Sequence, residues 1–213
     1  MSDNTVTVSR SDPYTDDWVI LKVLNADETV FLKRSLENLI TNSNIKSNTY
    51  NKSITGIKCE RFDLFDYIND TSYGTPILKK VISVVNDALA ASKLTTKNVN
   101  RVNMAWTING YENAFHTIHS HTPKNILFNQ RRPFGISVSI YLTVPTVVDP
   151  LRTGNLYAVL QDRNKDNYTF SHHPEEGDVL IFPSWIYHGT VPQSPGLRQT
   201  LNFDFILEDI HEE

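Results

Sequence analysis

The change of pattern near Asn100 limits the possible folds of this chain more than any other feature. Before it, apolar residues recur at helical spacing in two segments. After it, the chain divides into short β-rich segments separated by turn residues. These segments are 101–108, 134–144, 155–160, 168–172, 178–182, 187–191 and 198–207. Helices followed by many short strands indicate an α+β fold, and the strand pattern favours a sandwich or barrel of the jelly-roll type.

Two helices and one strand are predicted before this change. Residues 17–24 are apolar enough for a short strand. Asn25 opens a capping-box pattern, which predicts a helix over 26–41. A second helix is predicted over 76–91, with Thr75 as its N-cap and proline at its first position. We expect both helices to pack outside one sheet and cover its apolar face.

Composition excludes several classes of protein. The chain has 213 residues, of which 39% are hydrophobic and 21% charged, which is enough apolar material for a core. A formal net charge of -4 argues against nucleic acid as the main partner. No run of 18 apolar residues exists, so no membrane span is expected. The polar N-terminus shows no secretory signal, and a single cysteine fits a reducing compartment, so we expect a cytoplasmic protein.

Histidine placement is the first sign of chemistry. His119 and His121 are two residues apart, and in an extended strand they would point to the same face. A third ligand must come from a distant part of the chain, and His188, which follows an apolar strand, is the best candidate. Neutral imidazole suits iron, zinc, copper or nickel. The alternative is that the pair consists of ordinary surface histidines.

Three further histidines and the cysteine are given structural interpretations, while His116 belongs to the same stretch as His119 and His121. His172 and His173 lie beside Pro174 and two glutamates, which predicts a solvated turn. His211 belongs to a charged tail. Cys59 is interpreted as a small buried hydrophobic residue, with a catalytic thiol as the alternative.

An arginine and a hydroxyl share one face of the last strand. Arg198 comes ten residues after His188, at the start of an apolar segment, and Thr200 is two residues further on. An arginine with a neighbouring hydroxyl can hold a carboxylate through forked, charge-assisted hydrogen bonds. If the strand face is buried, the arginine needs an anionic partner. The alternative is an outward-facing arginine at a strand edge.

Together these segments resemble the iron(II)- and 2-oxoglutarate-dependent oxygenases. The chain looks most similar to the small prolyl-hydroxylase-like branch that is common in marine bacteria and their phages. The motifs that carry the resemblance are His119–His121, Tyr141–Leu142, Gly177–His188 and Arg198–Thr200. The block from Gly177 to Thr200 is specific, and the resemblance covers roughly residues 100–207.

The resemblance implies a fold, two cofactors and a set of residues. The fold is a double-stranded β-helix over 100–207 with a helical N-terminal elaboration over 1–99, in one oxygenase domain spanning 1–213. The implied cofactors are Fe(II) and 2-oxoglutarate. The implied residues are His119 and His188 for the metal, Arg198 and Thr200 for the distal carboxylate, and Tyr141 facing the cosubstrate. Phe182 and Trp185 are interpreted as packing residues.

The chain departs from the family at position 121. Relatives commonly have a carboxylate there, and this chain has His121. Three alternatives stay open: a metal face of three histidines, a His121 that supports the ligands while an acid enters from elsewhere, or lost iron chemistry. Glu112, Asp149 and Asp162 are acids without the right spacing. The insert 123–133 is also unlike close relatives and is a candidate lid or substrate loop.

The activity implied by the resemblance is a hydroxylation driven by O2 and 2-oxoglutarate, with release of succinate and CO2. No catalytic residue is expected beyond the metal centre, and ascorbate would serve as reductant in an assay. The substrate is a protein or small molecule that the sequence does not identify, and the oligomeric state is equally open. If the chain is phage-encoded, it would act in the host cytoplasm. Two rival functions are a non-catalytic jelly-roll binding module and a cupin-like enzyme with three histidines.

Overall fold

In a computed structural model, the described residues form two antiparallel sheets and three helices. The structure describes residues 6–10, 17–48, 59–69, 71–95, 97–121, 135–146, 149–162 and 164–209. The helices are α1 (Ala26–Asn42), α2 (Phe65–Ile68) and α3 (Gly74–Ser92).

The larger sheet has seven strands, and three of them come from the N-terminal part of the chain. Its order is β1 (Val6–Arg10), β2 (Trp18–Val23), β9 (Asp178–Pro183), β6 (Gly135–Thr143), β11 (Arg198–Asp209), β4 (Lys97–Gly110) and β3 (Cys59–Asp63). The smaller sheet has the order β5 (His116–His119), β10 (Tyr187–Thr190), β7 (Leu156–Gln161) and β8 (Asn167–His172).

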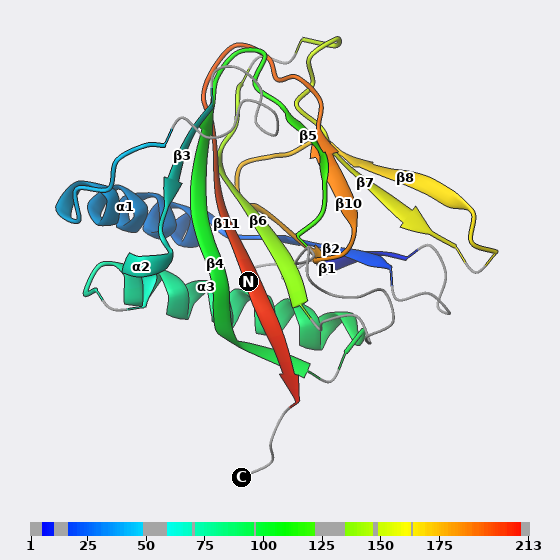
Figure 1. The fold of residues 1–213 in the computed structure, drawn as a ribbon, viewed down its shortest axis with the longest axis horizontal. Coiled ribbons are helices and arrows are strands. Elements are labelled where there is room, and N and C mark those ends of the chain that lie inside the picture. The colour runs from blue at the N-terminus through cyan, green and yellow to red at the C-terminus, as the bar shows by residue number, and fades with distance from the viewer. Residues whose placement is uncertain are drawn as a thin grey trace.

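The larger sheet lies between two apolar layers. One layer consists of the helices with alternate residues of the strands, such as Leu36, Val81, Ile140 and Phe203. In Figure 1 the helices lie at the left and bottom, beside the long strands of this sheet, and the smaller sheet lies at the upper right. The second layer fills the space between the two sheets. Two packed sheets with helices on one outer face form the jelly-roll core, and the predicted α+β double-stranded β-helix is confirmed.

Strand alternation turns the polar residues of β11 toward the smaller sheet. Leu201, Phe203 and Phe205 pack in the layer with the helices. Because successive side chains of a strand point to opposite faces, the even-numbered residues of β11 point the other way, into the roll. These residues are Arg198, Thr200, Asn202 and Asp204, and all except Thr200 are buried.

Most predicted elements match, and a few need correction. The capping box at Asn25 is present, since its side chain accepts from the Glu28 amide and the Glu28 carboxylate accepts in return. The predicted N-cap at Thr75 is wrong, because α3 begins at Gly74, whose amide donates to the Thr71 hydroxyl. Thr75 lies inside the helix and donates to a carbonyl of the preceding turn.

The N-terminal part was predicted to be mainly helical. The structure adds β1, β3 and the single turn α2 to it. β1 is only five residues long and β3 shows no apolar alternation, so neither stands out in the sequence. None of the helices in the described ranges is long and apolar enough to cross a membrane.

Candidate metal and cosubstrate site

Three histidines from two strands converge inside the roll. His119 ends β5, His121 follows two residues later, and His188 lies in β10 directly opposite His119. One ligand nitrogen from each of the three lies within 4.8 Å of the others. The ring centroids of His119 and His188 are 4.5 Å apart. The three imidazoles therefore face a common point that a metal ion would fit.

Two of these imidazoles are oriented by backbone carbonyls. His119 Nδ1 lies 2.7 Å from the Thr117 carbonyl oxygen, and His188 Nδ1 lies 3.0 Å from the Ile186 carbonyl oxygen. Because a carbonyl can only accept, each Nδ1 carries the proton and donates it. The Nε2 atoms are left as the unprotonated nitrogens that a metal needs.

The third imidazole is held by a buried carboxylate. His121 Nδ1 lies 2.7 Å from Asp204 Oδ1, and Asp204 is 5% exposed in β11. The Ser137 hydroxyl donates to the same Asp204 oxygen at 2.7 Å. Here too the acceptor fixes the proton on Nδ1 and leaves Nε2 toward the cluster. A carboxylate is thus part of this centre, but it contacts His121 rather than the point at which the three histidines converge.

The environment of His119 and His188 favours their neutral forms. Burial lowers the pKa of His188 well below its usual value, and the nearby His121 and His119 lower it further. Burial also lowers the pKa of His119, although its hydrogen bond to Thr117 acts in the opposite direction. Neutral imidazoles are the form that binds metals. The ring of Phe182, with its centroid 4.7 Å from that of His188, lies on the apolar side of the cluster.

Arg198 lies inside the roll beside this cluster. It is 4% exposed, so the prediction of an inward-facing arginine is met and the outward-facing alternative is not. Its guanidinium donates to the Gly154 carbonyl at 2.9 Å and lies 3.4 Å from the Thr190 hydroxyl. No carboxylate pairs with it among the residues that the structure describes. Burial lowers the pKa of Arg198, which is the electrostatic cost of this arrangement.

Tyr141 and Thr200 are neighbours on the same inner face. They are paired residues of β6 and β11. Tyr141 is 2% exposed, and burial raises its pKa to about 12, so the phenol keeps its proton and can donate. The Thr200 hydroxyl accepts from the Asn202 amide at 3.0 Å, which leaves its own proton available. Both groups can therefore donate hydrogen bonds to an anion in the roll.

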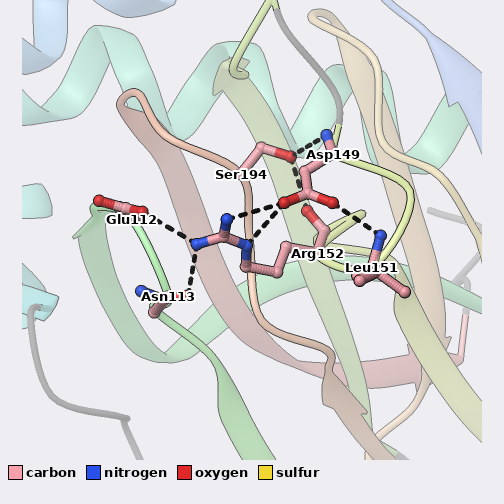
Figure 2. A network of polar contacts seen from close by, with 6 residues as sticks. All are labelled: Glu112, Asn113, Asp149, Leu151, Arg152 and Ser194. Atoms are coloured by element: carbon pink, nitrogen blue, oxygen red, sulfur yellow. Dashed lines mark hydrogen bonds and ion pairs between the residues drawn. The ribbon is translucent and has the colours of Figure 1, made fainter.

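A surface network of polar contacts holds the loop whose Gly154 carbonyl accepts a hydrogen bond from Arg198 (Figure 2). The Arg152 guanidinium contacts Asp149 at 2.8 Å and Glu112 at 2.9 Å. The Ser194 hydroxyl donates to the Arg152 carbonyl at 2.7 Å and accepts from the Asp149 amide at 2.7 Å. Three loops are joined in this way, and one of them ends at Gly154, whose carbonyl accepts from Arg198.

This network also decides the role of the candidate acids. Asp149 and Glu112 are paired with Arg152, and neither belongs to the histidine cluster. Asp162 accepts backbone amides of its own turn at the end of β7. The acid that the sequence interpretation did not find is Asp204.

Other predictions are partly corrected. His172 was predicted to be in a solvated turn, but it ends β8 and its Nε2 lies 2.7 Å from the buried Asp178. His173 is exposed, as expected. Cys59 is half-buried and burial raises the pKa of its thiol, so the reactive thiolate is disfavoured. Trp185 is partly buried and donates to Asp17 at 2.9 Å. His211 and the insert 123–133 lie outside the described residues.

Comparison with known proteins gives similarity of structure but not of sequence. No family model matches the chain, and no curated protein matches it. Among solved structures, a Pseudomonas putida prolyl-4-hydroxylase is 16% identical with a TM-score of 0.59, over 88% of this chain and 91% of that one. A Trichoplax adhaerens prolyl hydroxylase in complex with a hypoxia inducible factor peptide is 13% identical with a TM-score of 0.61, over 96% and 84%.

A third similar structure carries a metal and a cosubstrate. HygX from Streptomyces hygroscopicus, with nickel and 2-oxoglutarate bound, is 15% identical with a TM-score of 0.59, over 90% of this chain and 83% of that one. The chain is therefore structurally similar to 2-oxoglutarate- and Fe(II)-dependent oxygenases, including prolyl 4-hydroxylases. At these identities the likeness establishes the fold alone.

Proposed function

We propose that this protein is an iron(II)- and 2-oxoglutarate-dependent dioxygenase that hydroxylates a C–H bond. The observation that carries the proposal is a buried arginine without an acidic partner in the described residues, inside the same roll as three convergent imidazoles. With O2, the two bound groups supply an oxidation that turns 2-oxoglutarate into succinate and CO2 and a substrate C–H bond into C–OH.

The metal would be held by the Nε2 atoms of His119, His121 and His188. Three protein ligands would leave coordination positions open for the cosubstrate and O2. Asp204 would keep His121 in the required tautomer and supply negative charge next to the ligand. Of the alternatives left by the sequence, the three-histidine face is the one we favour.

The cosubstrate's distal carboxylate would pair with Arg198. A buried guanidinium leaves several N–H groups unused when only the Gly154 carbonyl and the more distant Thr190 hydroxyl accept from it. A dianionic keto acid would supply the missing acceptor charge. Tyr141 and Thr200 would donate to the same molecule, and the apolar wall between the sheets would exclude water.

The structural relatives support this function without fixing the substrate. Those named above include enzymes that hydroxylate prolyl residues, and HygX has been seen with hygromycin B. A protein side chain or a small molecule is therefore proposed as substrate. The marine bacterial and phage branch also stays a prediction from the sequence motifs.

The rival with a specific observation in its favour is a cupin-like enzyme that needs no keto acid. Three imidazoles without a carboxylate ligand would suit it. The buried position of Arg198 speaks against it, since such an enzyme has no use for an unpaired buried cation.

The test separates metal binding from cosubstrate binding. We expect the wild-type protein to bind nickel, to gain thermal stability from 2-oxoglutarate, and to release succinate with iron, ascorbate and O2. His188→Ala should lose the metal. Arg198→Ala should keep it, and should weaken 2-oxoglutarate binding by about 2–5 kcal/mol, the cost of truncating a buried charge pair. His173→Ala, an exposed histidine, is the control. Wild-type protein that binds metal but gains nothing from 2-oxoglutarate would favour the cupin-like rival.

A further inference from the structure

A fourth histidine, His116, is turned toward the histidine cluster by an irregularity in β5. The register pairs His188 with His119 and Thr190 with His116, so two steps along β10 match three along β5. In a regular strand, residues three apart face opposite sides. The extra residue is a β-bulge, and bulges near active sites commonly re-aim a side chain. The ring centroids of His116 and His119 are 6.1 Å apart, while Ile118 points outward and is 51% exposed.

His116 lies near both Arg198 and the histidine cluster. Its backbone amide donates to the Thr190 hydroxyl at 2.9 Å, and that oxygen lies 3.4 Å from the Arg198 guanidinium. Apart from burial, the charge of Arg198 influences the pKa of His116 most, ahead of His119. The imidazole is thus near both Arg198 and the cluster, where a ligand that contacts both could also contact His116.

The ring of His116 is the one imidazole of this group without a hydrogen-bond partner in the described residues. His119, His121 and His188 each have Nδ1 bonded to a protein acceptor. In the described part of the chain, the one fully enclosed side-chain polar atom without a partner is Gln193 Oε1. The nitrogens of His116 are therefore not fully enclosed by the described residues, and a bound molecule could reach them.

The imidazole of His116 is neutral at physiological pH. Burial and the Arg198 charge lower its pKa to about 3. A neutral imidazole presents one N–H donor and one acceptor nitrogen. It can support an anion already paired with Arg198 and adds no second positive charge near a bound metal ion.

We propose that His116 contacts the cosubstrate and donates a hydrogen bond to the distal carboxylate of 2-oxoglutarate, next to Arg198. This inference rests on the proposed function. It assigns the carboxylate two kinds of donor, a guanidinium from β11 and an imidazole aimed by the bulge in β5. It also gives His116 a role in selecting dicarboxylic over monocarboxylic keto acids.

The experiment compares two keto acids on the nickel-loaded protein by calorimetry. Pyruvate shares the 2-oxo acid group of 2-oxoglutarate and lacks the distal carboxylate. In His116→Phe, which keeps a ring but has no N–H, 2-oxoglutarate affinity should fall about 10- to 100-fold, as expected for losing a hydrogen bond to a charged group. Affinities for pyruvate and nickel should be unchanged. His116→Gln, which can still donate a hydrogen bond, should recover part of the 2-oxoglutarate affinity. Ile118→Ala, on the same strand but facing outward, is the control and should bind 2-oxoglutarate as the wild type does.

Two results would overturn the assignment. One is equal 2-oxoglutarate affinity in His116→Phe and wild type. The other is a parallel loss of nickel and pyruvate binding, which would show that the residue only shapes β5. If wild-type protein binds nickel but no 2-oxoglutarate, the proposed function fails first and the assignment of His116 fails with it.

Discussion

The carboxylate behind His121 leads to a prediction with a matched control inside the same chain. Asp204→Asn removes a negative charge and keeps the size of the side chain. In the wild type, Asp204 accepts from His121 Nδ1 at 2.7 Å and from the Ser137 hydroxyl at 2.7 Å. An asparagine keeps an oxygen that can accept these bonds, but it has no negative charge and its NH2 group can donate, so it favours less strongly the tautomer that leaves Nε2 free.

The expected loss is one of metal affinity. Removing a partner that orients a metal-bound histidine typically weakens metal binding about 10- to 100-fold, or about 1.4–2.8 kcal/mol. Asp204 and its histidine have side-chain exposures of 8% and 15%, so solvent does little to screen the pair. We therefore expect a value in the upper part of this range.

The assay is competition for nickel against a chelator of known affinity. Asp178→Asn is the control, since Asp178 and His172 form a second pair at the same 2.7 Å with exposures of 5% and 16%. Both variants lose a buried charge and should lose similar stability, but only Asp204→Asn should bind nickel more weakly. Equal nickel affinity in Asp204→Asn and Asp178→Asn would refute the reasoning.

Two further predictions concern stability. Leu36→Ala, at a fully buried position under the larger sheet, should cost about 2–5 kcal/mol in chemical denaturation, while Leu151→Ala, 91% exposed, should cost almost nothing. The metal-free protein should lose stability as pH falls below about 6.5, because the unfolded chain protonates histidines that stay neutral when folded. For His116, with a folded pKa of about 3, the loss is about 1.4 kcal/mol per pH unit across that interval. His116→Phe should make the change between pH 7.5 and 5.5 shallower, and a stability independent of pH in wild type would contradict this.

Most of the fold could be predicted because its signals are local. The capping box at Asn25 and the strands after residue 100 follow from neighbouring residues, and both are present. The edge strand β3 could not be predicted in the same way. Its five residues, Cys59–Asp63, are all partly buried and show no alternation of apolar and polar side chains. Its place in the sheet depends on pairing with β4, which lies far along the chain.

The candidate site was predictable where strand alternation holds. The two-residue period of a strand continues from Arg198 and Thr200 to Asn202 and Asp204. The sequence alone could therefore have predicted an inward-facing acid at Asp204. The spacing expected of a metal ligand does not identify Asp204, because its carboxylate contacts His121 rather than the metal position. His116 was not predictable, because the bulge in β5 reverses the alternation that strand reasoning relies on.

His121 and Asp204 are best explained together. Where relatives commonly have a carboxylate at position 121, this chain has a histidine there and a carboxylate behind it at position 204. From the family pattern, His121→Asp alone should restore a common metal site. The structure predicts otherwise, because the new carboxylate would face the buried Asp204, and two buried like charges cannot both stay ionised. We expect His121→Asp to bind nickel more weakly than wild type. The double variant with Asp204→Asn should recover about 2- to 150-fold, since the coupling between contacting residues is about 0.5–3 kcal/mol. The asparagine amide can donate to the new carboxylate, whereas an aspartate cannot. If the single variant binds nickel as tightly as the double variant, then Asp204 and position 121 are independent, and the carboxylate of this centre has no part in holding the metal ligand.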